Sequence, residues 1–313
     1  MMDVTKIATR QGYAEALAEL GGLHTDVVVL DADLAEATKT ALFREKYPDR
    51  HIECGIAEAN MMGVAAGMAA CKKVPFVSTF AMFAAGRAFE QIRNSIAYPG
   101  MNVKIGATHA GISVGPDGAT HQCNEDIALM CSIPGMVVVQ PCDAEEAKAV
   151  VKAAYVYHGP VYMRFSRFPV PVVNRQPGYE VVLGKGVVLK EGSDVTLVSS
   201  GIMVSESLKA ADALEKQGIC VEVLNFHTIK PLDEELLLKS AGKTGCVVTV
   251  EEHSVVGGLG SAVCDVLSQK CPSRVMKIGI EDTFGESGSA EELLEKYGLC
   301  ASCICKRIYQ WMN

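Results

Sequence analysis

Short valine-rich segments alternate with longer segments of helix-forming composition along the first half of this chain. We expect strands at residues 27–30, 74–78, 103–107, 136–139 and 161–164. We expect helices at residues 43–46, 57–70, 82–97, 125–131 and 144–157. Strands that alternate with helices pair in parallel, and each helix crosses one face of the sheet. The alternation therefore predicts a doubly wound α/β fold.

The alternation stops between residues 168 and 186, where Pro169, Pro171 and Pro177 indicate an extended linker. A second set of expected strands (195–199, 220–224, 246–250, 275–278) and helices (203–216, 233–239, 260–270, 290–296) follows. A chain of 313 residues is long enough for about two domains. We predict two doubly wound α/β domains, at residues 1–170 and 186–313, joined by a linker at 171–185.

Charge and hydropathy narrow the class of protein. The formal net charge is −8 and no run of Lys or Arg occurs, which argues against nucleic acid as a partner, although one phosphate could still bind. The first ten residues lack the apolar core of a signal peptide, and the longest apolar stretch, 61–71, is too short to span a bilayer. We expect a soluble, cytoplasmic protein that does not enter the membrane.

The twelve cysteines are scattered through expected strands and helices, so reduced thiols are favoured over a disulfide framework. Cys300, Cys303 and Cys305 lie close together near the C-terminus. We interpret them as structural cysteines on a terminal helix, with a metal or redox site as the alternative. No fourth ligand or second cysteine pair is evident, so we expect no metal site on this chain.

A glycine-rich loop at residues 106–122 follows the expected strand at 103–107. It carries His109, Asp117 and His121 among four glycines and one proline, a composition that excludes a regular helix or strand. Loops at strand ends are where α/β proteins usually place their chemistry. The loop therefore indicates a site for a small polar ligand.

Two further features have both a structural and a functional interpretation. Glu58 is expected at the start of a helix of small and apolar residues, where its charge could do no more than interact favourably with the helix dipole. If the side chain is buried there, its protonated form would be favoured, which would suit proton transfer. Phe80 and Phe83 are three residues apart and could belong to the core or form a platform for a ligand. Neither feature decides the function alone.

Taken in order, a series of motifs resembles the pyrimidine-binding domain of transketolases, thiamine-diphosphate enzymes that move two-carbon ketol units between sugar phosphates. The series is Asp-Ala-Asp-Leu (31–34), Gly-Ile-Ala-Glu (55–58), Thr-Phe-x-x-Phe (79–83), Thr-His (108–109), Gly-Pro-Asp-Gly-Ala-Thr-His-Gln (115–122) and Arg-Phe-Ser-Arg (164–167). The second half resembles the C-terminal domain of the same enzymes, so the resemblance covers nearly the whole chain.

The resemblance implies a role for five residues around the cofactor thiamine diphosphate. Glu58 matches the glutamate that hydrogen-bonds N1′ of the aminopyrimidine and thereby helps the 4′-nitrogen to take the proton from the thiazolium ring. Phe83 matches the aromatic residue that stacks on the pyrimidine, with Phe80 and Leu34 completing an apolar cradle. Asp33 is expected near the cofactor.

Five more residues match positions that contact the sugar substrate. Asp117 corresponds to the residue that hydrogen-bonds the C2 hydroxyl of the donor sugar. His109 and His121 correspond to catalytic histidines that contact sugar hydroxyls or the carbonyl. Arg167 corresponds to the arginine that binds the substrate phosphate, and Arg10 to a second phosphate-binding arginine.

One departure concerns the same phosphate site. After residues 31–34 the family often has a serine that contacts the phosphate, whereas this chain has Ala-Glu-Ala-Thr at 35–38. Either Thr38 takes over that contact or the phosphate is bound less tightly, and a different acceptor sugar would then be favoured.

The family's diphosphate-binding domain has no counterpart in this sequence. No Gly-Asp-Gly followed by an Asn pair is present, although that motif holds Mg²⁺ and the diphosphate in transketolases. The resemblance therefore implies the C-terminal subunit of a split transketolase. Its N-terminal partner subunit would carry Mg²⁺, in an α2β2 heterotetramer.

Three alternatives stay open. The β subunit of a 2-oxo acid dehydrogenase has the same two-domain plan and also supplies a glutamate to thiamine, but the loop around Asp117 favours sugar chemistry. A 1-deoxyxylulose-phosphate synthase-like enzyme has a similar loop but is normally one long chain. A non-catalytic regulatory module that kept the fold is the alternative from another class.

Overall fold

Seven strands form the sheet of the first half, in the order β12-β6-β7-β5-β4-β2-β3. The computed structural model describes residues 5–174, 176 and 178–312. The six strands from β6 to β3 run parallel, and β12 is antiparallel to β6. Their bounds are β2 Val27–Asp31, β3 His51–Glu53, β4 Val74–Phe80, β5 Lys104–Thr108, β6 Val137–Val139, β7 Val161–Arg164 and β12 Thr228–Lys230.

Both faces of this sheet are covered, because the apolar side chains of each strand point alternately to the two sides. Val28 and Leu30 of β2 share a core with Met61 of helix α4 (Glu58–Ala70), whereas Val27 and Val29 share a core with helices α1 (Thr9–Leu23) and α7 (Ala144–Val156). The expected doubly wound α/β sheet is confirmed.

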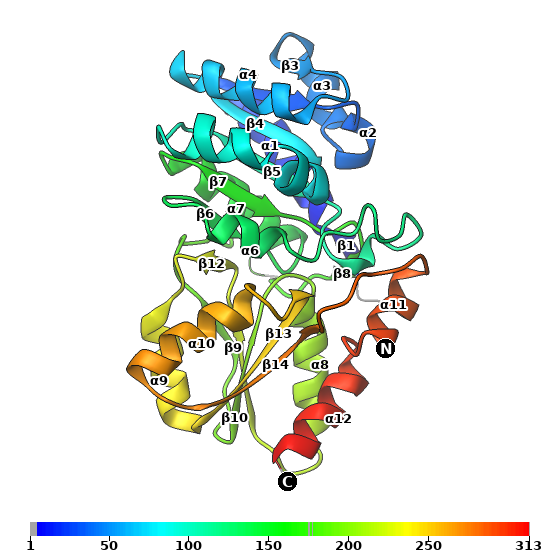
Figure 1. Cartoon of the computed structure of the whole chain (residues 1–313), viewed down its shortest axis with the longest axis vertical. Helices are drawn as coiled ribbons and strands as arrows, with labels where there is room; N and C mark the ends of the chain where they lie inside the picture. Colours follow the sequence, from blue (N-terminus) through cyan, green and yellow to red (C-terminus); the bar gives the residue numbers. More distant parts are fainter. Residues whose placement is uncertain (1–4, 175, 177, 313) are drawn as a thin grey trace.

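The second half folds around a five-stranded sheet with the order β14-β13-β10-β11-β9. Its strands are β9 Val187–Lys190, β10 Val195–Ser199, β11 Val221–Asn225, β13 Cys246–Ser254 and β14 Arg274–Ile280, of which only β9 is antiparallel to its neighbour. Figure 1 shows α8 (Met203–Glu215) and α12 (Ala301–Met312) on one side of this sheet, with α9 (Glu234–Thr244) and α10 (Leu259–Lys270) on the other. The short helix α11 (Ala290–Lys296) lies beside the first half.

Three features depart from the expected boundary between the two halves. Strand β12 comes from the second half of the sequence but extends the first sheet. Strand β8 (Pro169–Pro171), where we expected only a linker to begin, pairs with β1 (Lys6–Ala8) at the N-terminus. Tyr179 and Leu183, from the same expected linker, pack on the core of the first half, while its residues 175 and 177 lie outside the described residues.

Two helical regions differ from the sequence prediction. Helix α1 was not predicted, because its three glycines are poor helix formers. One of them, Gly12, allows helix α7 to pack closely, since a Cβ at that position would lie 2.1 Å from the Ala144 carbonyl oxygen. The helix expected at 82–97 is interrupted by wide π-type turns, η2 (Phe83–Arg87) and η3 (Ile92–Ala97), on either side of α5 (Phe89–Gln91). Such turns are frequent at functional sites.

The remaining elements are short and connect the strands to the helices. They are α2 (Ala35–Thr38), α3 (Ala41–Lys46), η1 (Pro48–Arg50), η4 (Ile112–Val114) and α6 (Asp126–Cys131). The single turn η4 is the regular part of the glycine-rich loop at 106–122, whose remaining residues after β5 are irregular.

Candidate functional site

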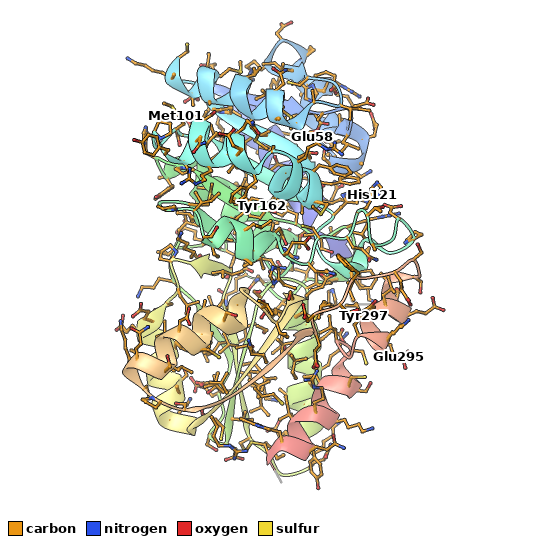
Figure 2. All side chains as sticks on the ribbon, viewed as in Figure 1. Glu58, Met101, His121, Tyr162, Glu295 and Tyr297 are labelled. Atoms are coloured by element: carbon orange, nitrogen blue, oxygen red, sulfur yellow. The ribbon has the colours of Figure 1, made fainter. Side chains whose placement is uncertain are left out.

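The predicted site residues gather at the carboxyl edge of the first sheet, where parallel α/β sheets bind their ligands. Figure 2 shows Glu58 and His121 toward the right of the upper half, with Met101, which precedes β5, at the opposite side. The predicted residues lie at or after the ends of β2, β3, β4, β5 and β7, or in the first turn of α1. They are Asp33, Leu34, Glu58, Phe80, Phe83, His109, Asp117, His121, Arg167 and Arg10.

Glu58 is the first residue of α4 and is 1% exposed. Arg87, at the end of η2, donates from Nη1 to both carboxylate oxygens of Glu58, at 2.8 and 2.7 Å. The sequence analysis did not predict this guanidinium as the partner of Glu58. Local sequence patterns could not predict this ion pair, because Glu58 and Arg87 are 29 positions apart in the chain.

Four rings form an aromatic wall next to this ion pair. Phe80 and Phe83 are nearly parallel, with centroids 5.6 Å apart, and His109 stacks on Phe80 at 3.8 Å. His121 meets Phe83 edge-on at 5.4 Å. The guanidinium of Arg87 lies 4.6 Å from the centre of the Phe83 ring, so Phe83 joins the ion pair to the wall.

His109 is held neutral in one tautomer. Arg10 approaches Nε2 of His109 at 3.0 Å through Nη1, and because arginine only donates, Nε2 must be the acceptor. The ring proton therefore lies on Nδ1, 2.9 Å from the hydroxyl of Thr108. Burial, reinforced by the charges of Arg10 and Arg167, lowers the pKa of His109 to about 3.

Arg10 and Arg167 approach one site from different elements. Burial lowers the pKa of Arg10, and the positive charge of Arg167 lowers it further. Arg167 donates from Nη1 to the Val114 carbonyl oxygen at 3.1 Å and to Oδ2 of Asp117 at 3.3 Å. Two guanidinium groups that repel each other are a natural binding place for an anion.

Thr38 is unavailable for the phosphate contact considered in the sequence analysis. Its side chain is fully buried, and its hydroxyl lies 2.9 Å from Oδ2 of Asp31 and 2.9 Å from the hydroxyl of Thr40. Asp31 also accepts from the Leu34 amide at 2.6 Å, and burial raises the pKa of Asp31 to about 6. Thr38 thus holds the turn after β2, while Arg10 reaches the same turn through the Ala37 carbonyl oxygen at 2.7 Å.

Asp33 and Leu34 lie at the site edge with different surroundings. Asp33 is exposed, has a φ of 60° and donates its amide to Oε1 of Glu53 at 2.7 Å. The same oxygen accepts from the Gly55 amide at 2.8 Å, so Glu53 joins the ends of β2 and β3. Leu34 is half-buried, in keeping with a place on an apolar wall.

The second half of the chain holds the loop that carries Asp117 and His121. Glu252 of β13 is 1% exposed and accepts from the Ser113 amide at 2.6 Å through Oε1. Gly111 leaves room for it, since a Cβ at that position would lie 2.3 Å from the Glu252 carboxyl group. Burial raises the pKa of Glu252 to about 7.

A buried ion pair also holds the chain directly after the loop at residues 106–122. Arg164, at the end of β7, donates from Nε to Asp126 of α6 at 2.8 and 3.1 Å, and both side chains are almost completely buried. Tyr162, in the centre of Figure 2, donates to Asp126 at 2.8 Å. Arg164 also donates to the carbonyl oxygens of Cys123 and Glu252, at 3.1 and 3.0 Å. It therefore joins the two halves behind the site.

No three His, Cys, Asp or Glu side chains of the described residues lie close enough to hold a metal ion. None of the described helices is long and apolar enough to cross a membrane.

Comparison with known proteins identifies the family. Residues 5–171 match the transketolase pyrimidine-binding domain, and residues 184–304 match the transketolase C-terminal domain. The chain belongs to the transketolase family. Both halves of the resemblance seen in the sequence are thereby confirmed.

Three relatives illustrate this membership. A solved structure described as a split-gene transketolase, inactive β4 tetramer, is 53% identical, has a TM-score of 0.91 and covers 97% of this chain and 98% of that one. The 6-deoxy-6-sulfo-D-fructose transketolase subunit of Clostridium sp. (strain MSTE9) is 44% identical over 96% of this chain and 93% of that protein. Transketolase of Homo sapiens is 36% identical over 97% of this chain, which spans 49% of the human protein.

Proposed function

We propose that this chain is the pyrimidine-binding subunit of a split, thiamine-diphosphate-dependent transketolase that transfers two-carbon ketol units between sugars with a terminal anionic group. The observation that carries the proposal is the buried Glu58 carboxylate, which Arg87 joins to the half-buried ring of Phe83. Membership of the transketolase family supports it.

The residues present fit an aminopyrimidine. Such a ring has a flat apolar face and a polar edge, and Phe83 offers a face for stacking while Glu58 offers a carboxylate to a ring N–H. Phe80, Leu34 and Asp33 complete this side of the site. Thiamine diphosphate, when bound, supplies a carbon nucleophile on its thiazolium ring. The part of this chain is to hold the pyrimidine and, at Glu58, to favour the form of the ring that accepts a proton.

The arginine pair and the loop residues suit a sugar with an anion at its far end. We assign Arg10 and Arg167 to the anion and Asp117 to a hydroxyl of the donor sugar. We assign His109 and His121 to sugar hydroxyls or the carbonyl, and at His109 a sugar hydroxyl would take the place of Arg10 on Nε2. The name of the Clostridium relative specifies a sugar with a sulfo group, an anion that the same guanidinium pair would suit.

The rest of the active site would come from a partner chain. This chain lacks the Gly-Asp-Gly motif and spans about half of human transketolase. We therefore assign Mg²⁺ and the diphosphate to an N-terminal transketolase subunit in an α2β2 heterotetramer, in the cytoplasm. The domains of this chain would be 1–170 and 186–313, with the linker at 171–185.

A ketol-transfer assay with and without the candidate partner tests the proposal. Xylulose 5-phosphate and ribose 5-phosphate are the substrates, and thiamine diphosphate and Mg²⁺ are present throughout. We expect turnover in the mixture and none with either chain alone. A stable complex without turnover would favour the regulatory module, and turnover with 2-oxo acids alone would favour the dehydrogenase β subunit.

A further inference from the structure

Cys300 and Cys303 form a thiol pair at the start of α12, remote from the site described above. Cys300 immediately precedes the helix, and its carbonyl oxygen accepts from the Ile304 amide at 3.0 Å. Cys303 is the third residue of the helix. Side chains three positions apart on a helix are about 5–6 Å apart at Cβ, a spacing that a small side-chain rearrangement converts to disulfide geometry.

The two thiols differ in acidity because of the hydrogen bonds between them. Burial raises the pKa of Cys300, but hydrogen bonds from Ser302 and from the thiol and amide of Cys303 outweigh burial and lower this pKa overall. The Ser302 hydroxyl lies 3.1 Å from the Cys300 sulfur. The pKa of Cys303 is raised, first by its hydrogen bond to Cys300 and then by burial, and the carboxylate of Glu295 acts in the same direction on both thiols.

The backbone around the pair is firmly held. Leu299 is fully buried and its amide donates to the Leu294 carbonyl oxygen at 2.7 Å, after a turn at Gly298 with a φ of 74°. The Ala301 amide donates to Glu206 of α8 at 2.9 Å, which fixes the first turn of α12. Both thiols are partly exposed, as a thiol that reacts with a solute requires.

The third cysteine of the motif does not belong to the pair. Cys305 is buried, and its sulfur accepts from the Gln217 amide group at 3.5 Å. Together with the absence of a metal-binding group among the described residues, this position disfavours a three-cysteine metal site.

We propose that Cys300 and Cys303 are a redox-active dithiol, with Cys300 as the attacking thiol and Cys303 as the resolving thiol, oxidised by a low-molecular-weight disulfide. The Cys300 thiolate attacks one sulfur of that disulfide, forms a mixed disulfide and releases one thiolate. Cys303 then loses its proton to solvent and attacks the Cys300 sulfur, which releases the second thiolate. Two protein thiols are oxidised to one disulfide, and the small disulfide is reduced to two thiols.

Helix α11 connects the thiol pair to the glycine-rich loop at residues 106–122. The Cys303 sulfur also lies 3.9 Å from the Glu295 carbonyl oxygen, and Glu295 lies on α11 (Figure 2). At the other end of α11, Ser289 and Ala290 line a groove of about 420 Å³ together with Ser113 and Arg167. Oxidation would therefore remove the contact between Cys303 and Glu295 at one end of α11, the helix whose other end borders this groove.

The test uses the full chain and glutathione disulfide, followed by alkylation of the remaining thiols and peptide mass spectrometry. We expect a disulfide within the peptide that holds both cysteines, seen as a loss of ~2 Da that dithiothreitol reverses. In Cys303→Ser, glutathione should stay attached to Cys300, and in Cys300→Ser no glutathione should be found at Cys303. Cys220, one of two exposed thiols with Cys71 among the described residues, is the internal control.

The proposal is overturned if Cys300 reacts no faster than Cys220, or if the wild-type chain keeps glutathione on Cys300 without closing the disulfide. Circular dichroism of both serine variants verifies that each is folded. The measurement needs neither the partner nor turnover, so its outcome is independent of the proposed function.

Discussion

The guanidinium of Arg87 holds both carboxylate oxygens of Glu58, at 2.8 and 2.7 Å. The buried carboxylate is thereby oriented at the start of α4 before any ligand binds. The cationic partner is half-exposed, with 50% of its side chain accessible. A ligand that offers a ring N–H can therefore share Glu58 with Arg87 without having to bury a new charge.

Removal of Arg87 should destabilise the chain through Glu58. In Arg87→Met the buried carboxylate loses its cation, and we expect a loss of about 1–2 kcal/mol in the free energy of unfolding. Glu58→Gln should make the same Arg87→Met change almost harmless. Urea unfolding of the four variants of this cycle gives the coupling energy, and additive effects would contradict the ion pair.

Arg167 should select sugars with an anionic end. We expect Arg167→Ala in the assembled enzyme to reduce the kcat/KM ratio of xylulose 5-phosphate to xylulose by about 10- to 100-fold, because a charge-assisted hydrogen bond contributes about 1.5–3 kcal/mol. The matched control is Arg307→Ala, which removes an arginine of α12 that pairs with Glu281. An unchanged ratio in Arg167→Ala would place the anion elsewhere.

Local patterns in the sequence predicted the parallel strands β2, β4, β5, β6 and β7, because each is a short apolar run that is buried on both faces. They missed β3, whose three residues are half-buried or exposed. They could not predict β12, three residues of the second half that cross to the edge of the first sheet. Helix α1 was missed because Gly12 serves a close backbone contact rather than helix propensity.

In the candidate site, too, local motifs could be predicted and contacts between distant residues could not. Motifs along the chain picked out Glu58 and Phe83, whereas Arg87 and Glu252 were missed because their partners are distant in sequence. Thr38 was considered for a phosphate contact because of its residue type. Its buried hydrogen bonds to the turn after β2 appear only in three dimensions.

Stability should respond to pH through His109. Its pKa is about 3 in the folded chain and about 6.5 in an unfolded one, so between these values only the unfolded chain binds the proton. The wild type should therefore lose about 1 kcal/mol relative to His109→Gln when the pH falls from about 7.5 to about 5.5. Urea unfolding at both pH values measures the difference, and a constant difference would show that His109 titrates normally.

Glu252 should produce the opposite trend. Its pKa is about 7 in the folded chain and about 4.5 in an unfolded one, so between these values only the folded chain binds the proton, and stability falls as the pH rises. Relative to Glu252→Gln, the wild type should lose about 2 kcal/mol between about pH 5 and about pH 8. Arg164, Asp126 and the Ser113 amide, which surround or contact Glu252, are the same in both proteins.

The loop itself gives a second measurement for Glu252. Glu252→Gln keeps an oxygen for the Ser113 amide, whereas Glu252→Ala does not. Hydrogen exchange at residues 111–115 should therefore be faster in the alanine variant and nearly unchanged in the glutamine variant. Equal exchange in both variants would show that Glu252 does not hold the loop.

The most direct test of the central claim is the turnover of the assembled two-subunit enzyme with Glu58→Ala in place of the wild-type chain. The account predicts that ketol transfer is abolished while size-exclusion chromatography shows the same complex, since Glu58 acts on the cofactor and not on assembly. The same substitution should leave Arg87 free in solvent, so the chain stays folded. Turnover at the wild-type rate from an intact Glu58→Ala complex would contradict the role assigned to Glu58 and, with it, the site proposed for this chain.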